Sequence, residues 1–218
     1  MNLAQLKTHY LAFLEQGLAA LSLTLTPVQK QQCLLYLASL KRWNQTYNLT
    51  AITDFRSMLI EHLFDSLSIS PYITGQRIID VGTGAGLPGI PLAIVHPDKY
   101  FVLLDARVKK SHFLTQMVYE LGLSNVAVVC KRVENYHPDS GFSAILTRAF
   151  SSLNNMLKLT KHLKQPQGCF LAMKGMIEEP MYKSIAQECC FMSEAKALQV
   201  PFLPAQRHLL IIKDVYCG

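Results

Sequence analysis

The chain has little of what marks an exported or membrane-spanning protein. Its 218 residues contain no apolar run that approaches the roughly 18–20 residues of a membrane span. The first 23 residues interleave Lys7, His9 and Glu15 with apolar residues, which predicts an amphipathic helix rather than a signal peptide. We therefore expect a cytoplasmic protein with no membrane partner.

Cysteine and histidine patterns typical of metal sites are also missing. The six cysteines include no C-x-x-C pair, and the seven histidines include no H-E-x-x-H motif. Ordinary buried thiols are the simplest interpretation in a cytoplasmic chain. We expect neither a bound metal nor a disulfide.

Acidic residues are fewer than basic ones, 15 against 21, so the net charge is +6. This balance suits a polyanionic partner such as nucleic acid, although dispersed basic residues are equally typical of solvated helix faces. Basic clusters occur at 41–42, 107–110, 131–132 and 158–164. Only folding could assemble them into one patch.

The N-terminal third reads as helices, and the rest alternates between strands and helices. Helical spacing of apolar residues covers 3–21, 27–43 and 56–70, with a polar loop at 42–54. We predict strands at 77–81, 100–105, 125–130, 142–147 and 168–174, and helices at 88–95, 107–121, 151–163 and 177–189. Two closely linked final strands, 195–201 and 207–214, are too near in sequence for a crossover, so we expect them to be antiparallel.

This order predicts an α/β fold, a seven-stranded and mostly parallel sheet with an antiparallel edge strand and helices on both faces. We expect residues 1–72 to form a helical section packed on a core formed by 73–218, as one compact unit. With no coiled-coil pattern or obvious adhesive edge, we expect a monomer.

The stretch IIDVGTGAGLPGIP, residues 78–91, raises the question of which ligand its glycines hold. Gly84, Gly86 and Gly89 satisfy G-x-G-x-x-G, a dinucleotide fingerprint. Asp105 ends the next strand 21 residues after Gly84, where an acid binds ribose hydroxyls. The pattern alone would indicate NAD or FAD.

Two features favour S-adenosylmethionine instead. Asp80 precedes Gly82 by two residues, which suggests a carboxylate at the mouth of the loop. A pyrophosphate at ~6 Å would cost about 3 kcal/mol per charge at a dielectric near 20, whereas a cationic ligand makes the same term favourable. Gly82, Thr83 and Gly84 also allow a compact ligand to approach the backbone closely. A dehydrogenase would further need a substrate domain, for which little chain remains.

Several sequence blocks resemble the bacterial small-subunit ribosomal RNA guanine-N7 methyltransferases, the glucose-inhibited division protein B family. They are WNQTYNLTAI (43–52), EHLFDSL (61–67), DVGTGAGLPGIPLAI (80–94), LLDARVKK (103–110), RVE (132–134), TRAFSSL (147–153), AMKG (172–175) and RHLLIIK (207–213). The resemblance implies a Rossmann-like class I methyltransferase fold, S-adenosylmethionine as donor and a guanine in 16S ribosomal RNA, free or in the 30S subunit, as acceptor. Ala106 and Val108 depart from the family's usual small polar residue and glycine.

The resemblance also implies cofactor contacts, which we combine with those predicted from the loop. The resulting set is Asp80, Gly82, Thr83, Gly84, Gly86, Leu87, Asp105, Val133, Glu134 and Arg148. Arg148 follows the fourth strand, at the edge where α/β proteins bind ligands, so we expect it to position a reacting partner.

Guanine N7 carries a lone pair and no proton, so its methylation needs no general base and depends on positioning. In A-form RNA this atom lies in a groove that side chains cannot enter, so the target must be unpaired or extruded. Candidates for holding it are Asn48, Lys174, His62 and Asp65, with Lys109 and Lys110 for the RNA. Asn48 could instead cap a helix, His62 and Asp65 could form a surface pair, and Lys174 could be a solvated strand end. An NAD-dependent oxidoreductase and an RNA-binding protein without catalysis stay open as alternatives.

Overall fold

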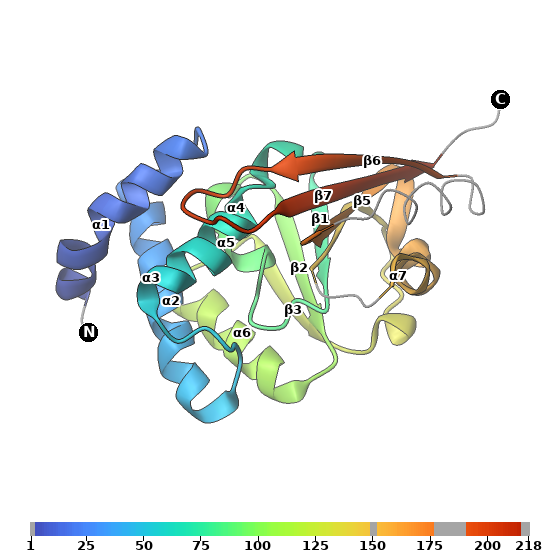
Figure 1. Ribbon diagram of the computed structural model, residues 1–218. Helices are drawn as coiled ribbons and strands as arrows, with labels where there is room; N and C mark the ends of the chain where they lie inside the picture. Colours follow the sequence, from blue (N-terminus) through green and yellow to red (C-terminus); the bar gives the residue numbers. More distant parts are fainter. Residues whose placement is uncertain (1–2, 149–151, 177–190, 215–218) are drawn as a thin grey trace.

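A computed structural model describes residues 3–148, 152–176 and 191–214 of the chain. Seven strands form one sheet with helices on both faces (Figure 1). The strands are β1 (Arg77–Val81), β2 (Tyr100–Asp105), β3 (Val126–Cys130), β4 (Phe142–Thr147), β5 (Lys164–Lys174), β6 (Phe191–Leu198) and β7 (Arg207–Asp214).

The strand order is β3-β2-β1-β4-β5-β7-β6, and the first five strands in sequence pair in parallel. β7 runs antiparallel to both β5 and β6, so the antiparallel pairing predicted for this edge is confirmed. The amino end of β7 therefore meets the carboxyl ends of the parallel strands, and His208 pairs opposite Lys174. β6 lies several residues before the predicted 195–201, because the chain from 199 onward forms the turn into β7.

Alternating strand residues build two separate apolar cores. Ile78, Phe101 and Leu103 face one core, and Ile79 and Val102 face the other, as the two-residue period of a strand requires. Helices α1 (Leu3–Ala20), α2 (Pro27–Tyr47), α5 (Gly89–Val95) and α6 (Val108–Glu120) contribute to the first core, and α7 (Leu153–Thr160) covers the second. The N-terminal helices thus share a core with the sheet. Within the described residues, no helix is both long and apolar enough to cross a membrane.

The helix α2 runs four residues further than predicted and takes in part of the expected loop. Thr26 caps its start in a reciprocal pair with Gln29, and Asn48 ends it in the left-handed conformation (φ 48°, ψ 55°). Polar residues in RWNQTYN suggested a loop, but Asn44 is buried and its side chain accepts a hydrogen bond from the Thr50 amide (2.8 Å). Tertiary contacts outweigh the low helix propensity of these residues.

The predicted helix at 56–70 consists of two short α-helical segments with a π-helical turn between them. They are α3 (Phe55–Met58), the π turn Leu59–Phe64 and α4 (Asp65–Leu67). A π turn widens the helix locally, which often re-aims side chains at functional sites. The predicted helix at 177–189 lies outside the described residues.

Candidate functional site

The glycine loop between β1 and α5 is held from beneath by Asp80. This side chain is 1% exposed, and its Oδ2 accepts hydrogen bonds from Thr83 Oγ1 (2.6 Å) and from the Gly89 amide (2.9 Å). The carboxylate therefore fastens the start of α5 to the end of β1. The expectation that Asp80 lies at the mouth of the loop is wrong, because helix α5 packs over it.

Burial has an electrostatic consequence for Asp80. Desolvation raises the pKa of its carboxyl to about 6, although the bonds from Thr83 and Gly89 and the positive charge of Arg148 oppose the shift. Its second oxygen, Oδ1, is buried and has no hydrogen-bond partner among the described residues. A buried acceptor without a donor is costly, so the loop retains an unmet preference for a donor or a positive charge.

A pocket of about 340 Å³ opens beside the loop, at the carboxyl ends of β1, β2 and β3. Its lining residues are Val81, Gly82, Leu104, Asp105, Ala106, Arg107, Lys110, Lys131, Arg132, Val133 and Glu134. Gly82 has φ +70°, and a Cβ built on it meets nothing within 4 Å, so its backbone is open to the pocket. We call this the cofactor pocket.

Asp105 organises one wall of the cofactor pocket. Its carboxylate accepts hydrogen bonds from the Gly84 amide (3.0 Å) and the Arg107 amide (2.9 Å), and lies 3.9 Å from Lys110 Nζ. A carboxylate oxygen has two lone pairs, so Asp105 can accept further donors such as a pair of hydroxyls. Lys110, which we predicted to bind the RNA, lines this pocket.

A second pocket, of about 530 Å³, lies at the same edge of the sheet, where β7 begins. Its lining residues are Ile52, Glu61, His62, Asp65, Arg148, Met173, Lys174, Gly175, Leu198, Arg207 and His208. We call it the base pocket. It unites four predicted residues from three distant parts of the chain: His62 with Asp65, Arg148, and Lys174.

Asp65 holds two arginines in the base pocket. Its carboxylate accepts a hydrogen bond from Arg207 Nε (3.1 Å) and lies 3.6 Å from Arg148 Nη1. Burial raises the pKa of Asp65 and outweighs the lowering by the two guanidinium groups. Asp65 is therefore no surface partner of His62. Its geometry suits positioning of the arginines, which are each about a quarter exposed.

His62 is buried in the wall of the base pocket by the π turn. Burial first, and then the nearby Arg148, lower the pKa of His62 to about 4, so the ring is neutral at pH 7. Its Nε2 lies 2.8 Å from Thr50 Oγ1, and the Thr50 amide is bonded to Asn44 at the end of α2. Nδ1 is buried, and no described part of the chain supplies a hydrogen-bond partner for it.

The remaining predicted residues divide between contact with a pocket and support of it. Gly82, Asp105, Val133 and Glu134 line the cofactor pocket. Thr83, Gly86 and Leu87 are buried in the loop and line neither pocket. Asn48 is the C-cap of α2, as its ordinary interpretation held, and Lys109 is exposed on the first turn of α6.

Arg207 and His208 are pocket residues that the sequence patterns did not single out. They begin β7, and an antiparallel strand brings its amino end to the edge where parallel neighbours end. The predicted antiparallel pairing, together with the block RHLLIIK, contained the signal that could have identified them.

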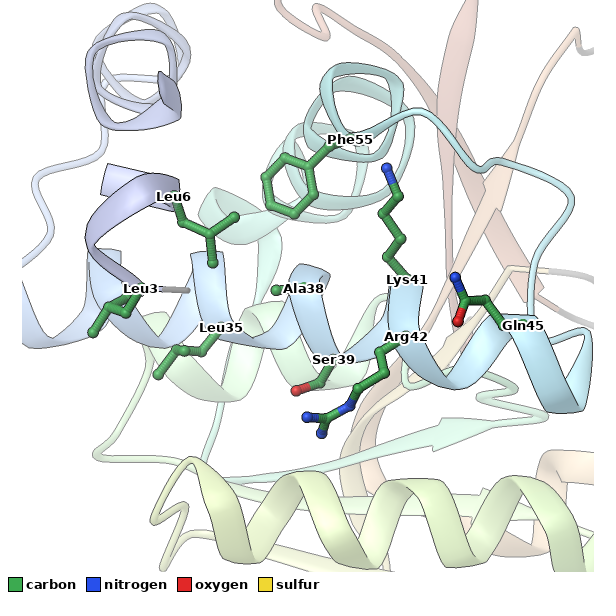
Figure 2. A pocket seen from close by; sticks show the side chains of 9 residues that line it. All are labelled: Leu3, Leu6, Leu35, Ala38, Ser39, Lys41, Arg42, Gln45 and Phe55. Carbon is green, nitrogen blue, oxygen red and sulfur yellow. The ribbon is translucent and has the colours of Figure 1, made fainter. Parts of the chain in front are cut away.

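Figure 2 shows another hollow, of about 510 Å³, between α1, α2 and α3. Leu3, Leu6, Leu35 and Phe55 line it on one side, and Lys41 and Arg42 extend from different faces of α2. Arg42 points toward α6, where it lies 3.7 Å from Glu120. The hollow has no convergent set of polar groups like those of the other two pockets.

Comparison with known proteins bears on what the two pockets do. The family model described as rRNA small subunit methyltransferase G matches residues 29–210. Curated proteins named ribosomal RNA small subunit methyltransferase G are 47% identical, one from Vibrio cholerae over 192 residues (88% of this chain, 91% of that protein) and one from Shewanella loihica over 199 residues (91% and 96%).

Solved structures share the fold at low sequence identity. A SAM-dependent methyltransferase from Aquifex aeolicus has a TM-score of 0.57 at 18% identity and covers 72% of this chain and 93% of its own. The plantazolicin methyltransferase BpumL has a TM-score of 0.58 at 12% identity and covers 83% and 96%.

Proposed function

Because the chain belongs to the rRNA small subunit methyltransferase G family, we propose that it methylates guanine N7 in 16S ribosomal RNA with S-adenosylmethionine as donor. The observation that carries this proposal is the adjacency of the two pockets through Arg148. This residue lines the base pocket, and its charge also acts on Asp80 beneath the glycine loop. A donor in one pocket and a base in the other would meet beside this guanidinium.

The cofactor pocket fits the donor in size, shape and charge. Its volume of about 340 Å³ lies within the usual range of small-molecule sites, roughly 300–1,000 Å³. The open backbone of Gly82 admits a ligand that a side chain would exclude. Asp80 adds negative charge beneath the loop without lining the pocket, and Asp105 in the pocket wall can accept the ribose hydroxyls.

S-adenosylmethionine supplies a methyl group on a positively charged sulfur. The chain supplies geometry: Arg148, held by Asp65, is placed to grip either the donor carboxylate or guanine O6. N7 is already a free lone pair, so no side chain has to remove a proton. The neutral His62 fits this requirement, because a protonated imidazole would add positive charge where the base becomes cationic.

The base pocket, of about 530 Å³, is where we propose that an unpaired guanine is held. Its walls come from the π turn and from the ends of β4, β5 and β7, with Lys174 and two arginines among them. We infer that the guanine is extruded from its stack before reaction. We also infer that one chain acts alone, in the cytoplasm, where ribosomal subunits are present.

The test is transfer from labelled S-adenosylmethionine to free 16S ribosomal RNA and to 30S subunits, followed by mapping of the modified base. We expect a single guanine modified at N7 and no binding of NAD in an equilibrium titration. Modification at another guanine atom would refute the N7 assignment, and NAD binding without methyl transfer would refute the donor.

A further inference from the structure

A basic rim surrounds the mouth of the cofactor pocket. Arg107 and Lys109 follow β2, and Lys131 and Arg132 follow β3. These strands are neighbours, so the two segments emerge side by side. All four side chains are exposed, and within the described part of the chain none of them has an ion-pair partner.

An aromatic surface lies at the end of α2. The Tyr47 ring is 39% exposed and stacks on Trp43, with ring centroids 5.1 Å apart and planes tilted by 25°. Trp43 in turn packs against Phe113 of α6 (5.5 Å). Because Tyr47 is supported from behind, a base could stack on it with little loss of conformational entropy.

Two contacts between α2 and α6 relate the aromatic surface to the basic rim. The side chain of Gln32 donates a hydrogen bond to the Leu121 carbonyl at the carboxyl end of α6. Trp43 packs on Phe113, which is nearer the beginning of that helix. Tyr47 is one turn beyond Trp43, which brings it toward the first turn of α6, where Lys109 lies.

The same end of α2 is also joined to the base pocket. Asn44, one turn before Asn48, bonds to the Thr50 amide, and the Thr50 hydroxyl bonds to His62 in the pocket wall. The end of α2 is therefore connected to the base pocket through Thr50, and it packs on α6, the helix that follows Arg107 of the basic rim.

We propose that single-stranded RNA beside the target guanine lies across the mouth of the cofactor pocket, with a base stacked on Tyr47 and phosphates bound by the basic rim. Stacking surfaces combined with a positive groove are how proteins hold single strands. This inference rests on the proposed function and specifies how that RNA is held. It also requires that bound RNA hinders exchange of the cofactor.

The stacking contact is tested by comparing Tyr47→Ala with Tyr119→Ala. Tyr119 lies near the far end of α6 and is 81% exposed, so it controls for loss of an exposed tyrosine. We expect Tyr47→Ala to weaken binding of 16S ribosomal RNA about tenfold, as loss of a base–aromatic stack does, and Tyr47→Phe to bind normally. Equal affinity of Tyr47→Ala and Tyr119→Ala would overturn the proposal.

The basic rim is tested through salt dependence. The double variant Lys109→Ala and Lys131→Ala should flatten the log–log slope of RNA affinity against salt by about 0.7 for each phosphate that the variant no longer neutralises. The matched control is the double variant Lys158→Ala and Lys161→Ala. These exposed cations lie at the end of α7, which leads into the amino end of β5, whereas the basic rim lies at the carboxyl ends of the parallel strands. If both doubles retain the same slope, the rim does not bind phosphate and the proposal fails.

Cofactor exchange tests the placement of the RNA. Release of S-adenosylhomocysteine from the wild type should slow when 30S subunits or 16S ribosomal RNA are bound, and the rim variant should lose this slowing. Equally fast release with and without RNA would show that the RNA does not cross the pocket mouth. Base mapping on the wild type separates failure of this inference from failure of the proposed function. If the wild type methylates guanine N7 while the rim variants behave like their controls, only this inference is refuted.

Discussion

The cofactor pocket and the base pocket lie at one edge of the same sheet but are built in different ways. The cofactor pocket takes its walls from three consecutive strand ends, at 81–82, 104–110 and 131–134. The base pocket draws on six separated positions along the chain, from Ile52 to His208. One pocket is a product of local sequence, and the other is a product of tertiary assembly.

Their electrostatics differ in a matching way. Asp80 is buried under the glycine loop beside the cofactor pocket, and Asp105 stands in the pocket wall. In the base pocket one buried carboxylate, Asp65, is shared by two arginines. Under the proposed function, Asp105 would accept the ribose hydroxyls of the donor, and the two arginines held by Asp65 would present fixed hydrogen-bond donors to the guanine. Substitutions should therefore affect donor affinity in one pocket and turnover in the other.

The largest effect is expected from Arg148→Ala, which disrupts the base pocket. Turnover at saturating RNA and donor should fall by ~10²-fold or more, because loss of positioning is costly in a reaction without acid–base help. Kinetics with labelled donor would measure this, with Lys161→Ala as the control for removal of an exposed charge. If only RNA affinity and its salt slope change, Arg148 is a phosphate contact and the division between the pockets is wrong.

Asp105→Ala should weaken ligand binding in the cofactor pocket by a factor comparable to the loss of turnover in Arg148→Ala. The affinities for S-adenosylmethionine and S-adenosylhomocysteine should both fall between about 10-fold and 100-fold, the usual cost of losing hydrogen bonds to a charged group. Both ligands carry the same ribose, so calorimetry should give similar losses, with turnover at saturating donor little changed. Asp105→Asn, which keeps an acceptor for the Gly84 amide, should lose less. Loss of only one ligand would place Asp105 at the sulfur end.

His62, in the wall of the base pocket, should lower the stability of the folded protein at acidic pH. Its pKa is about 4 when folded and 6.5 when exposed, so its contribution to stability is complete above pH 6.5 and is lost as pH falls toward 4. Between pH 7 and pH 5 the wild type should lose about 2 kcal/mol of unfolding free energy relative to His62→Gln. Denaturant titrations at both values measure this, and parallel curves would show that His62 is not held neutral.

Gly82→Ala should weaken binding of the donor, and Gly122→Ala is its matched control. Both glycines have positive φ, +70° and +63°, and both have open space where a Cβ would lie. Each variant should lose about 1 kcal/mol of stability from backbone strain. Only Gly82 faces the cofactor pocket, so only its variant should bind S-adenosylmethionine about tenfold more weakly. Equal donor affinities in the two variants would remove Gly82 from the cofactor site.

The smallest expected effect comes from Asp80. Its contribution to stability changes with pH in the direction opposite to that of His62. The pKa of this carboxyl is about 6 when folded and 3.8 when exposed, so its ionisation opposes folding above pH 6, and the opposition is relieved as pH falls. Between pH 7 and pH 5 the wild type should gain about 1 kcal/mol relative to Asp80→Asn. Wild type and variant with the same pH dependence would mean that Asp80 is not desolvated.

The contrast between the pockets also explains which predictions succeeded. The strand ends, the parallel order and the glycine loop follow from short patterns, since strand period and glycine placement are local properties. The end of α2 and the position of Asp80 could not be predicted in this way. The end of α2 packs on a distant helix through Trp43 and Phe113, and Gly89 of α5 packs against Leu103 of β2 as well as over Asp80.

The sequence by itself determined the sheet, the loop that opens at Gly82 and the acid at Asp105, together with the family resemblance that the comparisons support. Only the tertiary structure decided that Asp65 holds Arg148 and Arg207, that His62 is neutral and that Lys110 lies in the cofactor pocket. The physical reason is that desolvation and ion pairing depend on which side chains the fold brings within a few ångströms. That proximity comes from packing between elements, and no short run of residues encodes it.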